Sequence, residues 1–116
     1  MNKLRTIEGG IIIALVIALY FLAQKYSLYF IFPGIDWVQH FMGGIGIALV
    51  VSGLITRNLK VILSVTLGMA LGWEVFERIG HIYLPMYINY GGTGDTLMDI
   101  FCAIMGTSLV LLATRE

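Results

Sequence analysis

Four long runs of apolar residues, separated by short polar segments, dominate the hydrophobic pattern of this chain. They cover about residues 7–24, 36–55, 61–80 and 95–113, and each is close to the length of about 20 residues that a membrane-spanning helix needs. Pro33-Gly34 and the segment Gly91-Gly92-Thr93-Gly94 are turn and loop signals between these runs. The pattern therefore predicts an all-α integral membrane protein, a compact bundle of four transmembrane helices forming a single domain over residues 1–116.

The composition supports a membrane protein over the other broad classes. Hydrophobic residues make up 59% of the 116 positions and charged residues only 12%, whereas about a quarter of the residues in a soluble domain are charged. A soluble chain of this size could not bury so much apolar surface. The net charge is +0 without a basic cluster, which argues against binding to nucleic acid. We therefore expect membrane lipids as the surroundings of the helices.

The positive charges predict an orientation. Lys and Arg residues favour cytoplasmic ends of spans, and five of the seven would lie at the inner ends if the N-terminus were cytoplasmic. We expect a multi-pass protein of the cell (inner) membrane with both termini cytoplasmic. The first run ends in bulky residues, Tyr20-Phe21-Leu22, where a signal peptide would have small ones, so we expect it to be a retained helix.

Acidic residues gather at the predicted outer ends of the last three spans. The pairs that share one helix face by their spacing of three or four residues are Asp36 with His40, Glu74 with Glu77, and Asp95 with Asp99. An ionised side chain facing lipid costs roughly 2.5–3.5 kcal/mol on insertion scales. We therefore expect the five carboxylates to face one another inside the bundle or a wet cleft, where their repulsion calls for protons or a cation.

A bound divalent metal ion would balance this charge. Oxygen ligands with an imidazole suit Mg, Mn, Fe or Zn, and we expect the ligands to be Asp36, His40, Glu74, Glu77, Asp95 and Asp99. A metal polarises phosphoryl or carbonyl groups and generates hydroxide, while a carboxylate can act as general base. We expect Glu77 and Asp99 to be catalytic. The leading hypothesis is an outward-facing, metal-dependent hydrolase or transferase acting on an envelope or lipid-linked substrate.

Other interpretations stay open at this stage. Asp36 and Asp95 have a residue type common at helix N-caps, and Glu74 has Arg78 four residues later as an ion-pair partner. Buried acids also line ion or proton pathways, and a metal can stabilise a non-catalytic scaffold. A homo-oligomer is a further open partner. His81 and the single cysteine, Cys102, lie close enough in sequence to join the site.

Two stripes of glycine predict close helix packing. Gly43-Gly44-x-Gly46 lies in the second run and Gly68-x-x-x-Gly72 in the third. Small residues let membrane helices approach closely. We expect these stripes to pack the second and third helices together beside Glu74.

Three segments carry a resemblance to a known family. They are Asp36-Trp-Val-Gln-His40-Phe, Trp73-Glu74-Val-Phe-Glu77, and Gly94-Asp95-Thr-Leu-Met-Asp99-Ile followed by Gly106. Over roughly residues 34–112 the chain resembles the YjdF-like inner membrane proteins, and more distantly it is similar to VanZ-like proteins, which are linked to glycopeptide-antibiotic resistance and the cell envelope. The resemblance implies a shared polar site made by these acids and the histidine.

Overall fold

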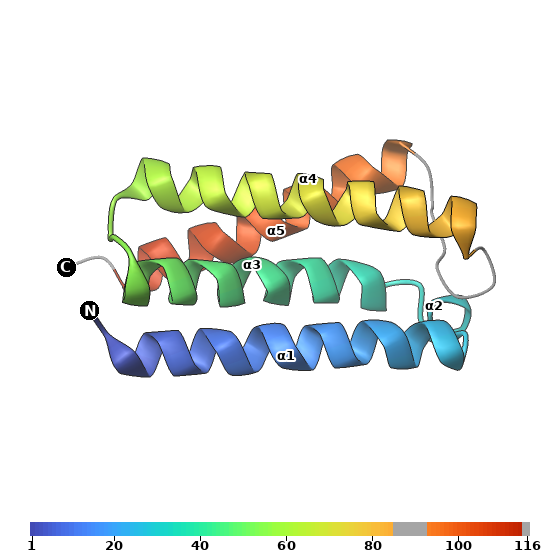
Figure 1. The fold of residues 1–116 in the computed structure, drawn as a ribbon, viewed down its shortest axis with the longest axis horizontal. Helices are drawn as coiled ribbons and strands as arrows, with labels where there is room; N and C mark the ends of the chain where they lie inside the picture. Colours follow the sequence, from blue (N-terminus) through green and yellow to red (C-terminus); the bar gives the residue numbers. More distant parts are fainter. Residues whose placement is uncertain (85–92, 115–116) are drawn as a thin grey trace.

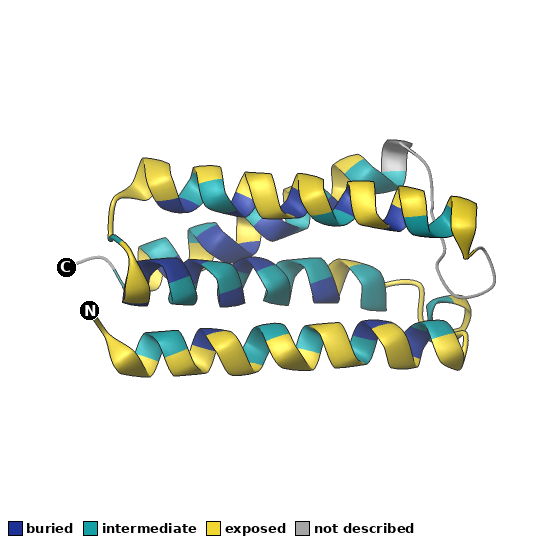
Figure 2. Cartoon of the chain, in the orientation of Figure 1, coloured by how far each residue is buried: buried dark blue, intermediate teal, exposed yellow. Residues whose placement is uncertain are grey.

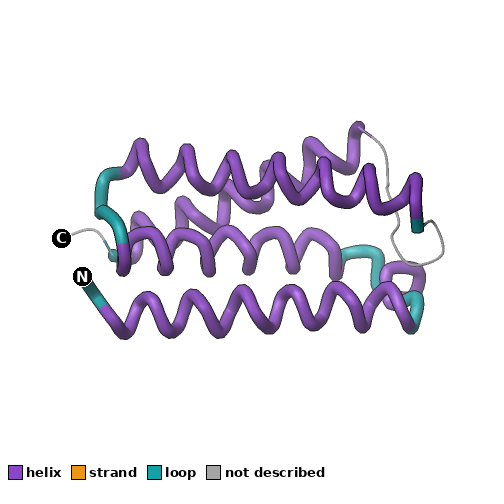
Figure 3. Tube along the Cα trace, in the orientation of Figure 1, coloured by secondary structure: helices purple, strands orange, loops and turns teal. Residues whose placement is uncertain are grey.

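The computed structural model describes residues 1–84 and 93–114 and consists of four long helices and one short one. The long helices are α1 (Lys3–Lys25), α3 (Ile35–Leu54), α4 (Leu59–Tyr83) and α5 (Thr93–Ala113), and α2 (Leu28–Ile31) is a single turn between α1 and α3. They run side by side as a bundle (Figure 1). The described residues form helices and loops and include no β-strand (Figure 3).

All four long helices are long and apolar enough to cross a membrane, which confirms the four predicted apolar helices. The bundle is 44 Å long and 23 Å across, and a bilayer with its headgroups is about 40–45 Å thick. Large apolar side chains cover its outside, among them Leu15 at 64% exposure and Val75 at 56%. Exposed positions follow the outer faces of α1 and α4 (Figure 2), as expected of helices surrounded by lipid tails.

Two asparagines extend helices beyond the predicted starts. The Asn2 side chain accepts a hydrogen bond from the backbone N–H of Arg5 at 3.2 Å, so α1 begins at Lys3 rather than near residue 7. Asn58 accepts from the N–H groups of Lys60 and Val61 at 3.0 and 3.4 Å, so α4 begins at Leu59. Satisfying these otherwise unpaired donors stabilises the first turn.

Helix α3 occupies the centre of the bundle because its small residues allow close contact on two sides. A Cβ at Gly44 would overlap the backbone of Ala103 in α5, and one at Gly46 would lie 2.8 Å from a side-chain carbon of Ile13 in α1. The part of the chain that is described shows no close backbone approach of α1 to α4 or α5. Among the long helices, the backbone of α1 therefore packs closely against α3, while its Tyr20 ring reaches Trp73 of α4.

The second glycine stripe does not pack as predicted. Within the described residues, a Cβ at Gly68 or Gly72 would meet nothing within 4 Å, and both positions are exposed on α4. The expected glycine contact between α3 and α4 is therefore wrong. The close approach is instead between α3 and α5, where Gly106 lies against the backbone of Phe41. The predicted link with Pro85 and Gly91-Gly92 lies outside the described residues.

Candidate metal centre

The six predicted ligands lie at one end of the α3–α4–α5 group, on three helices. Asp36 and His40 come from α3, Glu74 and Glu77 from α4, and Asp95 and Asp99 from α5. Their spacing of three or four residues turns each pair to the interior, where Glu74, Glu77 and Asp99 are 7%, 6% and 1% exposed. The structure thus brings all six residues together, and their roles as ligands remain a prediction.

The first of two groups with metal-binding geometry contains His40, Glu74, Glu77 and Asp99. Each of the four offers one ligand atom, and these atoms lie within 4.8 Å of one another. Ligands of a divalent transition metal lie about 2.0–2.2 Å from the ion, so two ligands of one ion are at most about 4.4 Å apart. The side chains of this group would have to draw together to bind one ion.

The second group contains Asp36, Asp95 and Asp99, again with ligand atoms within 4.8 Å of one another. Asp99 belongs to both groups. Asp36 and Asp95 are only partly buried, in contrast to Asp99. Neither group includes His81 or Cys102 among the residues that the structure describes.

His40 connects the two groups. Its Nε2 lies 3.3 Å from Asp36 Oδ1, the predicted partner four residues earlier, and 3.2 Å from Asp99 Oδ2 on α5. One ring nitrogen carries one proton or one lone pair, so it cannot satisfy both carboxylates through a single hydrogen bond. This contact links α3 to α5, but the single His40 nitrogen cannot supply a hydrogen bond to each of the two carboxylates.

Several carboxylate oxygens in this end of the bundle are buried without a hydrogen bond. Among the residues with described side chains, Glu74 Oε1, Glu77 Oε1 and Asp99 Oδ1 have no hydrogen-bond partner, and Asp99 Oδ2 has the shared nitrogen of His40 at 3.2 Å. The other Glu74 oxygen, Oε2, accepts from the Thr96 hydroxyl at 3.1 Å. Buried polar atoms are nearly always paired, and an unpaired buried charge is costly. These oxygens can therefore take up a proton or bind a cation.

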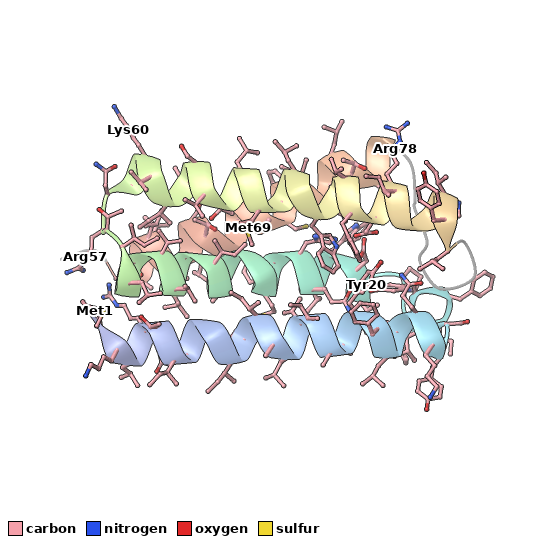
Figure 4. All side chains as sticks on the ribbon, viewed as in Figure 1. Met1, Tyr20, Arg57, Lys60, Met69 and Arg78 are labelled. Carbon is pink, nitrogen blue, oxygen red and sulfur yellow. The ribbon has the colours of Figure 1, made fainter. Side chains whose placement is uncertain are left out.

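Two cavities meet beside the acids. A polar one of about 340 Å³ is lined by Asp36, Glu77 and Asp95, and an apolar one of about 140 Å³ reaches His40 between α1, α3 and α4. Tyr20 lines both, and it lies between α1 and α3 at this end of the bundle (Figure 4). Larger cavities of about 410 and 430 Å³ at the opposite end have Arg5 and Arg57 in their walls and no acidic residue among the described lining, so they do not suit a cation.

The structure adds polar residues that the sequence did not indicate. The Tyr29 hydroxyl donates to Gln39 Oε1 at 2.6 Å, while Gln39 Nε2 and the Tyr20 hydroxyl are buried without a partner in the described part of the chain. Burial, and secondly the charge of Asp36, raise the pKa of Tyr29, which keeps its hydroxyl a donor. Gln39 lies three residues after Asp36, which is a signal that spacing could have given, but Tyr20 has no such signal.

The N-cap interpretation of two acids is wrong. Gly34 is the residue that caps α3, and Asp36 lies inside the first turn. Helix α5 begins at Thr93, so Asp95 also lies inside the helix. Both carboxylates instead turn toward Asp99. Arg78 is exposed on α4, and its suggested pairing with Glu74 stays a prediction.

Comparison of the chain with protein families, with curated proteins and with solved structures gives no match. The resemblance to YjdF-like and VanZ-like proteins therefore stays an expectation from three short segments. The functional argument has to rest on the geometry of the site itself.

Proposed function

We propose that this chain is a membrane-embedded metal-dependent hydrolase or transferase that acts on an envelope or lipid-linked substrate. One observation carries the proposal: three carboxylates at least nine-tenths buried turn unpaired oxygens toward one another and toward an imidazole. Such a set has the ligand types of a divalent cation site. The ion would be held by His40, Glu74, Glu77 and Asp99.

The site residues divide the chemical work by their surroundings. A bound divalent ion supplies Lewis acidity toward a phosphoryl or carbonyl oxygen and lowers the pKa of bound water. Glu77 lines the polar cavity, so the carboxylate oxygen of Glu77 that does not bind the ion is placed to take a proton from water that enters there, as a general base. Asp99 is 1% exposed, which suits a ligand that orients the centre. Thr96 holds Glu74 through its hydrogen bond.

The adjoining cavities support an amphiphilic substrate. The polar cavity suits a charged headgroup, and the apolar cavity is lined by side chains such as Ile13, Val16 and Ile47, which suit an alkyl chain. Tyr20 and Gln39 line the apolar cavity, and Tyr20 also lines the polar one. Both can donate a hydrogen bond to a substrate oxygen. A lipid with its reactive oxygen near His40 would satisfy these donors.

We place the site at the outer face of the cell membrane and both termini in the cytoplasm. The proposal rests on Lys3, Arg5, Arg57 and Lys60, which belong to the helix ends and the turn remote from the acids. Asn2 and Arg57 lie at that remote end, where the Asn2 backbone N–H donates to Gly53 O at 2.8 Å and Arg57 Nη2 donates to Thr114 O at 3.0 Å. A substrate would then arrive from the outer leaflet.

An ion or proton pathway is supported less well. Below the acids the bundle is closed by an apolar cluster of buried residues, Ala48, Val51, Ile62 and Val110. A charged species would have to cross this cluster at a high desolvation cost. Flux through liposomes that contain the purified protein separates the cases, because the enzyme interpretation predicts none above empty liposomes.

The experiment is a reconstituted assay with metal analysis. Wild type is compared with Glu77→Gln, Asp99→Asn and a matched control, Glu8→Gln, whose side chain is exposed on α1. Vesicles contain a long-chain alkyl phosphate or an alkyl ester, and headgroup release is followed with Mn²⁺ or Zn²⁺ and with chelator. We expect metal-dependent release that falls at least about 100-fold in both site variants and is unchanged in the control. Metal content and release equal in wild type and both site variants would contradict the proposal.

A further inference from the structure

We propose that the centre holds two metal ions, with Asp99 as the carboxylate that bridges them. The first ion is the one of the proposed function, on which this inference rests, and the second is held by Asp36, Asp95 and Asp99. The sharing of one residue by two ligand groups is the feature that leads to a pair of ions rather than one.

Asp99 is suited to bridging by both of its oxygens. The side chain is 1% exposed. Oδ2 lies 3.2 Å from Nε2 of His40, which belongs to the first group, while Oδ1 has no hydrogen-bond partner among the described residues. A carboxylate that served one ion through Oδ2 alone would leave Oδ1 buried and unsatisfied, which is unfavourable for a charged group. One ion on each oxygen gives both atoms a partner.

The two groups also contact each other. Nε2 of His40, a residue of the first group, lies 3.3 Å from Oδ1 of Asp36, a residue of the second. Ions in two-metal sites lie about 3.5–4 Å apart. Ligands of neighbouring ions are expected to be in contact at such a separation, as these are.

The charges of the two groups favour two ions. Their five carboxylates are Asp36, Glu74, Glu77, Asp95 and Asp99, and one imidazole accompanies them. A single divalent cation would leave three negative charges in a largely buried cluster if all are ionised, whereas two would leave one. Repulsion at these distances is strong where water is scarce, so the second ion makes full ionisation of the cluster tenable.

The two positions differ in access. Glu74, Glu77 and Asp99 are buried, but Asp36 and Asp95 are partly exposed and line the polar cavity of about 340 Å³. Two of the three ligands of the second ion therefore line the cavity, whereas Glu77 is the one ligand of the first ion that does so. We assign the second ion the role of holding a substrate headgroup oxygen, and we expect it to exchange faster than the first.

The test is metal stoichiometry joined to magnetic resonance of the detergent-solubilised protein. The full chain is loaded with Mn²⁺, freed of excess metal, and measured for manganese per chain and for its electron paramagnetic resonance spectrum. We expect about two Mn²⁺ per chain and the spectrum of a magnetically coupled pair. Asp95→Ala should retain about one ion with the hyperfine spectrum of isolated Mn²⁺, and Glu8→Gln should match wild type.

The outcomes separate this inference from the proposed function. One Mn²⁺ per wild-type chain with an isolated-ion spectrum would overturn the pair but leave the single-metal enzyme intact. No bound Mn²⁺ and no bound Zn²⁺ would overturn both. Two ions that persist in Asp95→Ala with an unchanged coupled spectrum would overturn the assignment of the second position. The wild-type measurement needs no variant, so misfolding of a variant cannot leave the inference undecided.

Discussion

Two buried polar layers lie in this bundle, and they differ in whether they are complete. In the middle, the Thr107 hydroxyl donates to Gly44 O at 3.0 Å, and Thr66 Oγ1 lies 2.8 Å from Thr107 Oγ1. Both threonines are 0% exposed. With Thr107 donating to the carbonyl, Thr66 donates to Thr107, and each hydroxyl is used. This threonine layer therefore links α3, α4 and α5 without any outside partner.

The acid layer, Asp36, His40, Glu74, Glu77, Asp95 and Asp99, uses the same three helices but is not closed. Described side chains leave three of its carboxylate oxygens, Glu74 Oε1, Glu77 Oε1 and Asp99 Oδ1, unpaired. Polar groups inside a membrane are retained when they pair with one another or serve a function. The buried threonines pair with one another, so burial of polar groups does not by itself indicate a functional site. Buried carboxylate oxygens without a partner are the feature that indicates one, and the following experiments test this difference between the two layers.

The largest effect is expected at Gly44, which supports both layers. A Cβ there would overlap the Ala103 backbone, so Gly44→Ala has to move α5 away from α3. We expect a loss of about 3 kcal/mol in the free energy of unfolding, measured by denaturant in detergent, since overpacking costs about 1–3 kcal/mol or more. The control is Gly68→Ala, which points into open space. An equal loss in both variants would contradict the assigned packing.

Metal binding should stabilise the protein through the acid layer alone. At a free Mn²⁺ or Zn²⁺ concentration of about one hundred times Kd, the free energy of unfolding should rise by about 2.7 kcal/mol over protein kept in chelator. Asp99→Asn should remove this gain, whereas Thr66→Val should keep it. Thermal melts with and without metal measure the difference. A gain of the same size in Asp99→Asn would show that the ion binds elsewhere.

Thr96 should tune metal affinity without being a ligand. Its hydroxyl donates to Glu74 Oε2 at 3.1 Å, and loss of such a supporting hydrogen bond typically weakens metal binding 10–100-fold. We expect Thr96→Val to raise the Kd about 10-fold, and Thr96→Ser to restore it, by competition with a metal-sensitive dye. Unchanged affinity in the valine variant would mean that Glu74 is not a ligand.

The smallest effect is expected from the threonine layer. Thr66→Val removes one hydrogen bond at similar volume, and interhelical hydrogen bonds in membranes average about 0.6 kcal/mol. The free energy of unfolding should fall by about that amount while metal content stays the same. A loss of bound metal in this variant would break the distinction between the two layers.

The sequence predicted the four apolar helices and the depth at which the acids meet, because both follow from local patterns. Run length sets a span, and spacing of three or four residues puts Asp95 with Asp99 on one face. The missed features depend on long-range packing. Tyr20 reaches the site because α1 packs on α3, and its ring lies 4.8 Å from that of Trp73 on α4. The periodicity of a sequence shows which residues share one face of a helix, but not which other helix that face contacts. For this reason the contact predicted for the Gly68 stripe was wrong.

Local chemistry explains the remaining differences. The short helix α2 follows Ser27, whose φ of 54° is left-handed, and it carries Tyr29 to Gln39. A tertiary hydrogen bond of this kind has no counterpart in hydropathy. The sharing of Asp99 between two ligand groups is likewise a property of three helices together, since α5 alone shows only its pairing with Asp95.

The most direct test of a cation among the buried carboxylates is X-ray absorption at the zinc edge of the Zn²⁺-loaded wild-type protein, beside Asp99→Asn. The account predicts nitrogen and oxygen neighbours at about 2.0–2.2 Å, with the scattering pattern of one imidazole from His40. Asp99→Asn should lose most of the signal at equal protein concentration. A spectrum of hydrated zinc without imidazole, or one identical in Asp99→Asn, would contradict it.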